Sequence, residues 1–309
     1  MLQEGINGFS MALADSVPGV SGGTVAFIMG FYDRFIGSIH GLAFGKGKER
    51  KEAAVYLLKL GAGWVVGMAL SAMVLSVLFE RYIYIVSSLF IGFIVGSVPL
   101  IVREEKDSLR EPGMGLFFGS LGMTAVAGIT WLNGSAGTMT VDLGQLSVGT
   151  VVRLFLYGMI AICAMFLPGI SGSTLLLIFG AYMPVMTAIK GMLSMELSYL
   201  PGLCIFGCGI VAGALTTVRV IRICLDKYRS QTVWTIIGMM MGSLYAVVMG
   251  PTTLETPQAA LSIGSFHIPA AAAGVLLVLG MQKMKEKNEE KEKQKARRTA
   301  GEGMQKQRN

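Results

Sequence analysis

The sequence predicts an all-α polytopic membrane protein built from two inverted-topology repeats, each with one re-entrant helical hairpin and three transmembrane helices. Its composition, its long apolar segments and an internal repeat lead to this prediction. Hydrophobic residues make up 53% of the 309 residues, charged residues 15%, and the mean hydropathy is +0.61. Soluble domains carry about 25% charged residues. The composition therefore argues against a soluble enzyme, a coiled coil, a disulfide scaffold or a disordered chain.

Eight apolar segments follow one another along the chain. A membrane-spanning helix needs about 20 apolar residues, and six segments suit one helix each: 53–79, 82–102, 113–132, 199–223, 231–250 and the somewhat short 267–283. The other two, 5–39 and 150–190, are too long for one helix, and Pro-Gly interrupts each of them. Since Pro breaks helix continuity, we expect a re-entrant hairpin in each, with two full-length helices as the alternative.

The placement of Lys and Arg predicts the topology, because basic loops stay in the cytoplasm. Basic residues gather at 46–51, 103–110, 227–229 and beyond 282, whereas 133–149 and 251–267 contain none. We therefore expect cytoplasmic N- and C-termini. In the tail, 286–309, interspersed Glu argues against a strong basic patch or a nucleic-acid partner and favours a solvated, disordered end.

An internal repeat divides the chain into two halves, 1–135 and 145–285. PGVSGGTVAFIMGFYDRFIGSI at 18–39 aligns with PGISGSTLLLIFGAYMPVMTAI at 168–189, with nine of 22 positions identical. At an offset of 146, Glu80-Arg81-Tyr82 matches Asp226-Lys227-Tyr228, and the Gly-rich faces match as well. These faces either pack within the monomer or form a dimer seam, and the oligomeric state stays open.

The predicted topology makes the repeat an inverted one. Glu80-Arg81 lies outside and Asp226-Lys227 inside, so equivalent helices run in opposite directions. This architecture is typical of secondary transporters, in which two inverted halves give one conformation open to each side.

The repeated motif PGxSG(G/S)T has the chemistry of an anion site. Pro and Gly interrupt the helix, and Ser is a good N-cap for the apolar helix that follows. A helix N-terminus offers free amides and a partial positive charge. The hairpin breaks are Pro18, Gly19, Pro168 and Gly169, and the expected anion-binding residues are Ser21, Gly22, Gly23, Thr24, Ser171, Gly172, Ser173 and Thr174. The competing interpretation is that these small residues only pack the hairpin tips closely.

Two ionisable residues within the long apolar segments are further candidates, because charges at membrane depth are usually functional. Asp15 lies three residues before Pro18, near the predicted tip, where it either couples transport to a proton or caps the structure. Arg153 lies near the outer end of its hairpin and either contacts an anionic headgroup or extends to the surface.

The four cysteines, Cys163, Cys204, Cys208 and Cys224, predict no metal site. All lie in apolar stretches without nearby His, whereas zinc sites usually take four N or S ligands. We expect them to be small buried hydrophobic residues, and nothing in the sequence calls for a cofactor.

The segments ADSVPGVSGGTVAFIMGFYDRFI and FLPGISGSTLLLIFGAYMPV resemble the bacterial polyprenyl-phosphate transporter family, formerly domain of unknown function 368. The resemblance covers about 5–285 and implies a multi-pass protein of the bacterial cytoplasmic membrane. It also implies a non-enzymatic flippase that returns undecaprenyl phosphate from the outer to the cytoplasmic leaflet for reuse in cell-envelope polymer synthesis. The phosphate would then lie at the two motifs, and the prenyl tail would stay in lipid between the helices.

Two other classes are weighed against this one. Membrane undecaprenyl-diphosphate phosphatases carry a similar motif, PGxSRS, but the Arg position is Gly22 and Gly172 here, and no Glu pair lies nearby. Phosphoryl transfer needs charge stabilisation and an activated nucleophile, and neither is visible. A transporter of small soluble anions needs a hydrated polar path, whereas the helices at 53–79 and 231–250 offer Gly, Ser and Met.

Overall fold

The computed structural model describes residues 2–15, 21–109, 112–133, 147–193, 195–253, 257–280 and 282–283. Every regular element among them is a helix, which confirms the predicted all-α class. The α-helices are α1 Leu2–Asp15, α2 Gly22–Ile28, α3 Tyr32–Phe44, α4 Gly47–Glu104, α5 Pro112–Asn133, α6 Val148–Phe166, α7 Gly172–Ile178, α8 Tyr182–Leu193, α9 Leu200–Lys227 and α10 Arg229–Met249. A further apolar helix, Ile268–Gly280, follows α10.

Six segments of the described chain are long and apolar enough to cross a membrane. They are Gly47–Ser71, Tyr82–Glu104, Gly113–Leu132, Val148–Phe166, Leu197–Lys227 and Arg229–Thr252. Large apolar side chains are exposed on their outer faces, among them Leu58 at 73%, Leu116 at 77% and Phe117 at 63%. Because a bilayer, unlike water, accepts such faces at no cost, the chain has the surface of a multi-pass membrane protein.

Each of the two long predicted hairpins folds into three helices instead of two. The first contains α1, α2 and α3, and the second contains α6, α7 and α8. A second interruption falls after the short middle helix, at Gly30 and at Gly180, where φ is +71° and +63°. Glycine adopts this left-handed backbone without steric penalty. The aligned sequences contain both glycines, but only the Pro-Gly interruption was expected.

The lengths of these helices bear on how the two segments sit in a bilayer. With 14 residues, α1 is shorter than a span, whereas α6 has 19 residues and qualifies as one. The re-entrant hairpin therefore stays a prediction for both segments.

The same kink occurs at equivalent positions of the two halves. Tyr82 interrupts α4 with φ −137° and ψ 33°, and Tyr228 separates α9 from α10 with φ −130° and ψ 43°. These two residues were aligned at an offset of 146. The arms of α4 thus correspond to α9 and α10, and the order of elements recurs in the two halves.

Glycines bring the backbones of neighbouring helices into contact inside the monomer. A Cβ atom at Gly63 would overlap the carbonyl of Gly5 on α1, and one at the equivalent Gly209 would overlap that of Phe155 on α6. The first arm of α4 therefore packs on α1 as α9 packs on α6.

Two further helix pairs connect one half to the other. Gly92 of α4 lies against Ala271 of the final helix, and the equivalent Gly238 of α10 lies against Gly119 of α5. Each half thus packs its last helix on the other half. The Gly-rich faces at these positions pack within the monomer, whereas a Cβ atom added at Gly61 or Gly207 would meet no atom within 4 Å.

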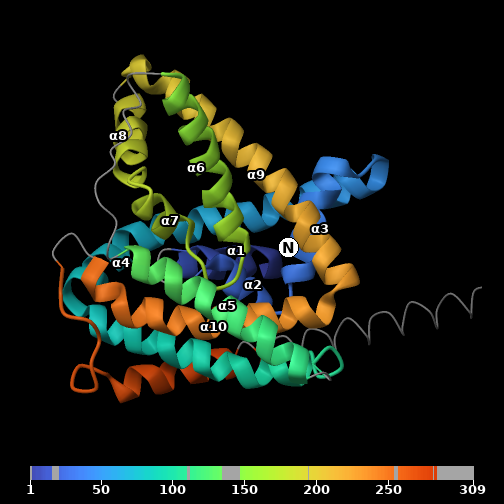
Figure 1. Ribbon diagram of the computed structural model, residues 1–309, viewed down its shortest axis with the longest axis vertical. Coiled ribbons are helices and arrows are strands. Elements are labelled where there is room, and N and C mark those ends of the chain that lie inside the picture. The colour runs from blue at the N-terminus through green and yellow to red at the C-terminus, as the bar shows by residue number, and fades with distance from the viewer. Residues whose placement is uncertain are drawn as a thin grey trace, which may run out of the picture.

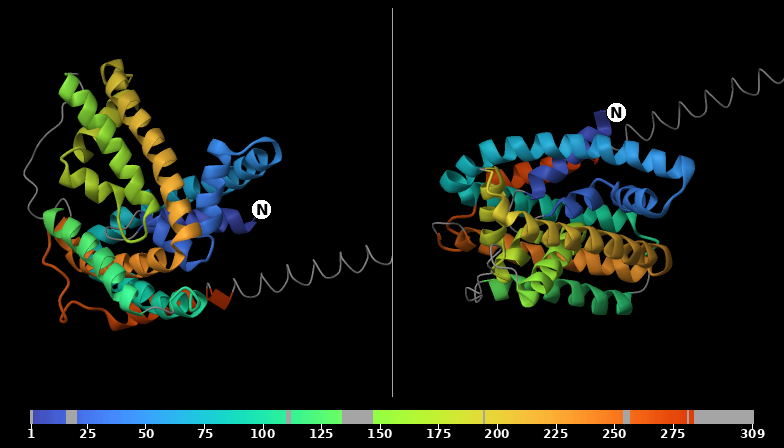
Figure 2. Two further views of the ribbon diagram at one scale, coloured as in Figure 1. Left: turned by 45° about the vertical axis from the view of Figure 1, so that its right-hand side comes forward. Right: turned by 90° about the horizontal axis from the view of Figure 1, so that it is seen from above.

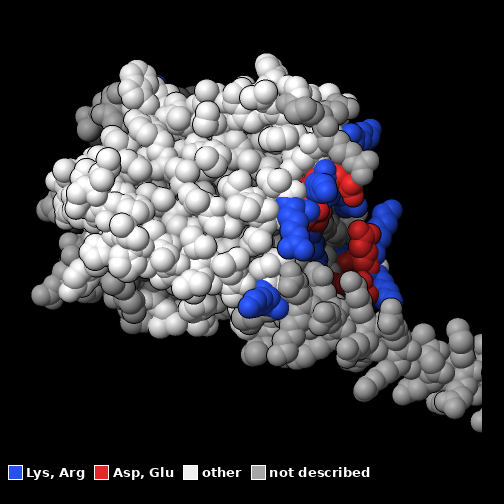
Figure 3. All heavy atoms as spheres, turned by 90° about the horizontal axis from the view of Figure 1, so that it is seen from below, with Lys and Arg blue, Asp and Glu red and all other residues white. Residues whose placement is uncertain are grey.

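In Figure 1, α6, α8 and α9 form the upper part of the molecule, and α5, α10 and the second arm of α4 form the lower part, with α2 between them. Figure 2 shows, from above, the long helices running roughly side by side. Among the described residues on the face in Figure 3, the charged side chains gather at one end and the others are uncharged. The main core cluster surrounds α2 and α3 and includes Phe27, Tyr32, Ile36, Ile94 and Met240.

Candidate functional site: two helix breaks that meet

The first copy of the motif begins a short buried helix. Ser21 is the N-cap of α2, with an extended backbone (φ −125°, ψ 151°), and its Oγ accepts a hydrogen bond from the Thr24 amide at 3.2 Å. This is the capping role expected of Ser. Residues 21–28 are all buried. The predicted break residues Pro18 and Gly19 lie outside the described residues.

Asp15 lies at this break, beside the start of α2. Its Oδ1 accepts from the Gly22 amide at 2.6 Å, and its Oδ2 accepts from the indole Nε1 of Trp64 at 3.0 Å. A Cβ atom at Gly22 would come within 2.7 Å of the carboxylate. The position of Asp15 was anticipated, but Trp64, 49 residues away on α4, was not, because nothing in an apolar helix indicates where an indole points.

The second copy of the motif supplies the other helix break. Leu167 is the C-cap of α6, and Pro168, Gly169, Ile170 and Ser171 are buried before α7 begins. Gly169 has φ +86°, and a Cβ atom there would come within 2.6 Å of the Met239 carbonyl oxygen. Only glycine fits both this backbone and this close approach to α10.

The start of α7 is also closely packed. A Cβ atom at Gly172 would lie 2.6 Å from the Ala161 carbonyl oxygen of α6. Ser173 and Thr174 lie in the first turn of α7, and their side chains are outside the described part of the structure.

Hydrogen bonds join the two copies directly, although they lie about 145 residues apart. The Gly169 amide donates to Thr24 Oγ1 at 2.8 Å, and the Ser21 hydroxyl donates to the Leu167 carbonyl at 3.2 Å. Tyr32, on α3, donates from its hydroxyl to the Phe166 carbonyl at 2.8 Å. The structure therefore places the first motif against the break that precedes α7.

Gly23 completes this contact between the copies. A Cβ atom there would lie 2.9 Å from the Phe166 carbonyl oxygen. Tyr32 was aligned with Tyr182 as part of the repeat, but its role in joining the breaks was not foreseen.

The polar groups at this junction are already in use. The Gly22 amide, one of the amides expected to bind an anion, donates to the carboxylate of Asp15, and the Thr24 hydroxyl oxygen accepts from Gly169. An anion would take the place of these internal acceptors. A bound anion can thus replace the Asp15 carboxylate and the Thr24 hydroxyl as the acceptor of these amide hydrogen bonds. Such a replacement leaves no amide unpaired, and an unpaired polar group is costly in this buried region.

Arg153 lies elsewhere. It is exposed near the start of α6, 13 residues before Phe166, which corresponds to about 20 Å along a helix. The structure does not bring it to the junction.

A second polar cluster, not anticipated from the sequence, lies where α3, α4 and α10 meet. Arg229 donates from Nη1 to Asp33 Oδ2 at 3.0 Å, from Nε to Glu105 Oε2 at 3.0 Å and from Nη2 to Glu105 Oε1 at 2.5 Å. The two ion pairs connect the first half of the chain to the second. A small polar pocket beside them is also lined by Tyr32, whose hydroxyl reaches the helix junction.

Three other arginines contact aromatic rings of α3 and α4. Arg34 lies over the Tyr56 ring at 4.5 Å and Arg219 over the Phe44 ring at 4.7 Å, whereas Arg222 Nη1 lies 2.7 Å from His40 Nδ1. These contacts connect α3 with the first arm of α4 and with α9.

Among the described residues, no group of three or more His, Cys, Asp or Glu side chains is placed to hold a metal ion. The expectation that all cysteines are buried was wrong for Cys204 and Cys208, which are exposed on α9. Cysteine is apolar enough to lie on a helix face directed at lipid.

Comparisons with known proteins agree with the resemblance of the motifs. The family described as VCA0040-like, undecaprenyl phosphate translocase-like, matches residues 11–264. A polyprenyl-phosphate transporter of Vibrio cholerae is 34% identical over 252 residues, which cover 77% of this chain and 75% of that protein. A polyprenyl-phosphate transporter of Staphylococcus aureus is 33% identical over 254 residues, which cover 81% of this chain and 87% of that protein. No solved structure matches. With both helix breaks inside the matched region, the chain belongs to the undecaprenyl phosphate translocase-like family.

Proposed function

We propose that this protein moves undecaprenyl phosphate, or a closely related polyprenyl phosphate, from the outer to the cytoplasmic leaflet of the bacterial cytoplasmic membrane, without chemical change. The observation that carries the proposal is the junction of the two helix breaks, where Ser21 and Thr24 contact Leu167 and Gly169. The two relatives, both polyprenyl-phosphate transporters, support this class of substrate. Two matching, inverted halves then supply one conformation open to each leaflet.

In this mechanism the phosphate binds where the breaks meet, at residues Ser21, Gly22, Gly23, Thr24, Ser171, Gly172, Ser173 and Thr174. Backbone amides and hydroxyl groups are the donors that a phosphate needs away from water. In the structure Asp15 accepts from the Gly22 amide, so a phosphate competes with this carboxylate. Asp15 must turn away or take up a proton before the anion binds, because two anions repel strongly at low dielectric.

The two hairpins exchange partners as the protein changes conformation. In the present arrangement the Thr24 hydroxyl accepts from the Gly169 amide, which holds the first break against the second. Substrate binding replaces these contacts with contacts to the phosphate. The two halves then separate on the side of one leaflet, which opens the site to that leaflet. Arg153, near the other end of α6, contacts the headgroup before it reaches the junction.

Purified protein in liposomes tests the proposal. Labelled undecaprenyl phosphate is placed in one leaflet and its redistribution followed, with phosphate release from undecaprenyl diphosphate measured in parallel. We expect protein-dependent redistribution without phosphate release, and its loss when Ser21 and Ser171 are both changed to Leu. The matched control is Ser120→Leu, because Ser120 is exposed on α5 and its hydroxyl donates to Phe117 in its own helix.

The other outcomes contradict different parts of the proposal. Phosphate release identifies an enzyme, and uptake of inorganic phosphate without lipid movement identifies a carrier of soluble anions. Normal lipid transport by the double Leu variant would exclude the helix junction as the phosphate-binding site.

A further inference from the structure

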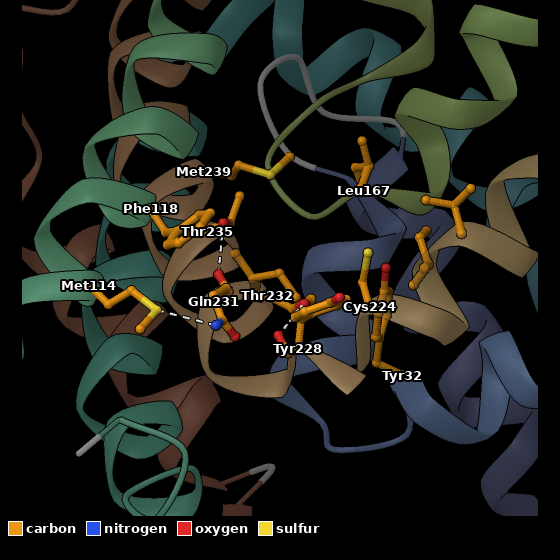
Figure 4. Close-up of a pocket in the computed structure, with 13 residues that line it drawn as sticks. Tyr32, Met114, Phe118, Leu167, Cys224, Tyr228, Gln231, Thr232, Thr235 and Met239 are labelled. Carbon is orange, nitrogen blue, oxygen red and sulfur yellow. Dashed lines mark hydrogen bonds between the residues drawn. The ribbon is translucent and has the colours of Figure 1, made fainter. Parts of the chain in front are cut away.

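A cavity of about 490 Å³ lies between α5, α9 and α10, and it reaches the helix junction. Apolar side chains of these three helices make up most of its lining, together with Tyr32 of α3 and Leu167 at the end of α6. Figure 4 shows these side chains around the opening. The volume falls within the range of about 300–1,000 Å³ that is usual for small-molecule sites.

Three polar residues of the lining direct their donors to other groups of the protein. The Thr232 hydroxyl donates to the Tyr228 carbonyl at 2.8 Å, and the Thr235 hydroxyl donates to the Gln231 carbonyl at 2.8 Å, both within α10. The Gln231 amide nitrogen lies 3.2 Å from Met114 Sδ. The wall is therefore suited to hydrocarbon, and a sugar or a free anion would find few donors in it.

The inner end of the cavity adjoins the proposed phosphate site. Leu167 lines the cavity, and its carbonyl accepts from Ser21, whereas Tyr32 lines the cavity and donates to the Phe166 carbonyl. In a lipid phosphate the chain starts at the phosphate oxygen. A chain site must therefore begin where the phosphate site ends, and this cavity does.

The outer side of the cavity faces the surface that lipid would cover. Met114 on α5 is 39% exposed and Val220 on α9 is 53% exposed, and both line the cavity. Next to them, Phe117 on α5 and Ile223 on α9 are exposed as well. A chain in the cavity can thus continue between α5 and α9 into the bilayer.

We propose that this cavity holds the first isoprene units of the lipid's prenyl chain while its phosphate lies at the helix junction. The inference rests on the proposed function and names the part of the substrate that the cavity recognises. The rest of a long chain passes out between α5 and α9. This inference modifies the expectation that the prenyl tail lies wholly in lipid.

The cavity selects by shape and not by hydrophobicity. Lipid tails are as apolar as the cavity wall, so moving a chain from bilayer to protein gains little from burial. The wall contains Met114 and Met239, whose flexible, polarisable side chains adapt to irregular shapes such as a methyl-branched chain. A phospholipid acyl chain is the alternative occupant, and the experiment separates the two.

Cys224 serves as a reporter inside the cavity, with Cys208 as its matched control on the exposed face of the same helix. Two proteins are prepared, each keeping one of these cysteines and carrying Ala at the other three. In liposomes of phospholipid alone, the rate of alkylation by an apolar maleimide is measured. It is measured again after addition of polyprenyl phosphate, polyprenol of equal length, or inorganic phosphate.

We expect polyprenyl phosphate to slow alkylation of Cys224 severalfold and to leave Cys208 unchanged, with a smaller effect of polyprenol. Inorganic phosphate should have no effect. Equal rates at Cys224 with and without polyprenyl phosphate overturn the inference, since phospholipid chains then fill the cavity equally well. Equal protection by inorganic phosphate also overturns it, because the effect then belongs to the phosphate site.

A pair of substitutions gives a second, independent measurement. Cys224→Phe fills the cavity, and overpacking at this level lowers transport of the long-chain lipid roughly tenfold. Cys208→Phe places the same ring on the lipid-facing side of α9 and should leave transport unchanged. Equal transport by both variants overturns the prenyl-chain site in the cavity but does not contradict the proposed transport of the lipid. Wild-type protein that moves no lipid at all overturns the proposed function, while protection of Cys224 still reports on the cavity.

Discussion

Replacing Thr24 by Val removes one hydroxyl from the junction of the two halves and keeps the shape of the side chain. Thr24 Oγ1 accepts from the buried Gly169 amide at 2.8 Å and lies 3.1 Å from Ser21 Oγ. In the variant the Gly169 amide loses its acceptor. Leaving one buried donor unsatisfied costs about 1–3 kcal/mol. The Ser21 hydroxyl keeps the Leu167 carbonyl as its acceptor, so it adds little to the loss.

The free energy of unfolding should therefore fall by about 1–3 kcal/mol in Thr24→Val. For a chain of this size, each kcal/mol corresponds to a shift of about 2–4 °C in Tm. Thermal unfolding of the protein in a mild detergent measures this shift, and Thr24→Ser, which restores a hydroxyl, should recover most of it.

Thr216→Val is the matched control for the same chemical change. The Thr216 hydroxyl donates to the Ala212 carbonyl within α9, and the residue is exposed. Its loss should change the free energy of unfolding by no more than about 0.5 kcal/mol, as for other surface changes. Equal Tm values for Thr24→Val and Thr216→Val would refute the reasoning, because the contact between the breaks would then contribute nothing.

Three further predictions concern helix packing, the Arg229 cluster and a histidine. Gly209→Ala should destabilise the protein by about 1–3 kcal/mol, because its Cβ overlaps a carbonyl of α6. Gly207→Ala, two residues away with no atom near its Cβ position, should not, and equal Tm values would contradict this account. Arg229→Lys loses the forked contact with its carboxylate neighbours. Because the Arg229 side chain is 42% exposed, its ion pairs contribute about 1 kcal/mol. We therefore expect a small loss of Tm that shrinks in high salt, and a large, salt-independent loss would show a different role. Burial, and then the positive charge of Arg222, lower the pKa of His40, which lies at the end of the first hairpin. The folded protein then binds fewer protons than the unfolded chain below about pH 6.5, so stability falls as the pH drops through this window. NMR titration of the ring should show the low pKa and its partial rise in Arg222→Gln, and an unchanged value would exclude this charge as a cause.

Much of the fold could be predicted because its signals are local or repeated. Apolar segments of spanning length lead directly to helices, and the alignment paired Tyr82 with Tyr228, two positions at which the structure has the same kink. The glycines at 63, 92, 209 and 238 indicated close helix packing, which the structure has. Their partners could not be predicted, since a small residue permits contact with any neighbouring backbone.

The candidate site was predictable in its residues but not in its contacts. The motif indicated the N-cap role of Ser21, and the sequence position of Asp15 placed it near the break. The partner of Asp15 is Trp64, and the partner of Thr24 is Gly169, and both depend on tertiary packing between distant segments. The cavity is shaped by gaps among α5, α9 and α10, and no pattern along one helix records such a gap.

The exchange of last helices between the halves has a consequence for how the protein is made. α5 leaves the ribosome long before α10, the helix on which it packs. The second arm of α4 likewise has no packing partner at its glycine face until the helix Ile268–Gly280 is made. Neither half has its full set of neighbours while it is alone in the membrane, so insertion of the first half cannot be followed at once by its final packing. We therefore expect a chain that ends before residue 268 to leave the glycine face of α4 uncovered and to be removed by membrane proteases, even though it retains both helix breaks.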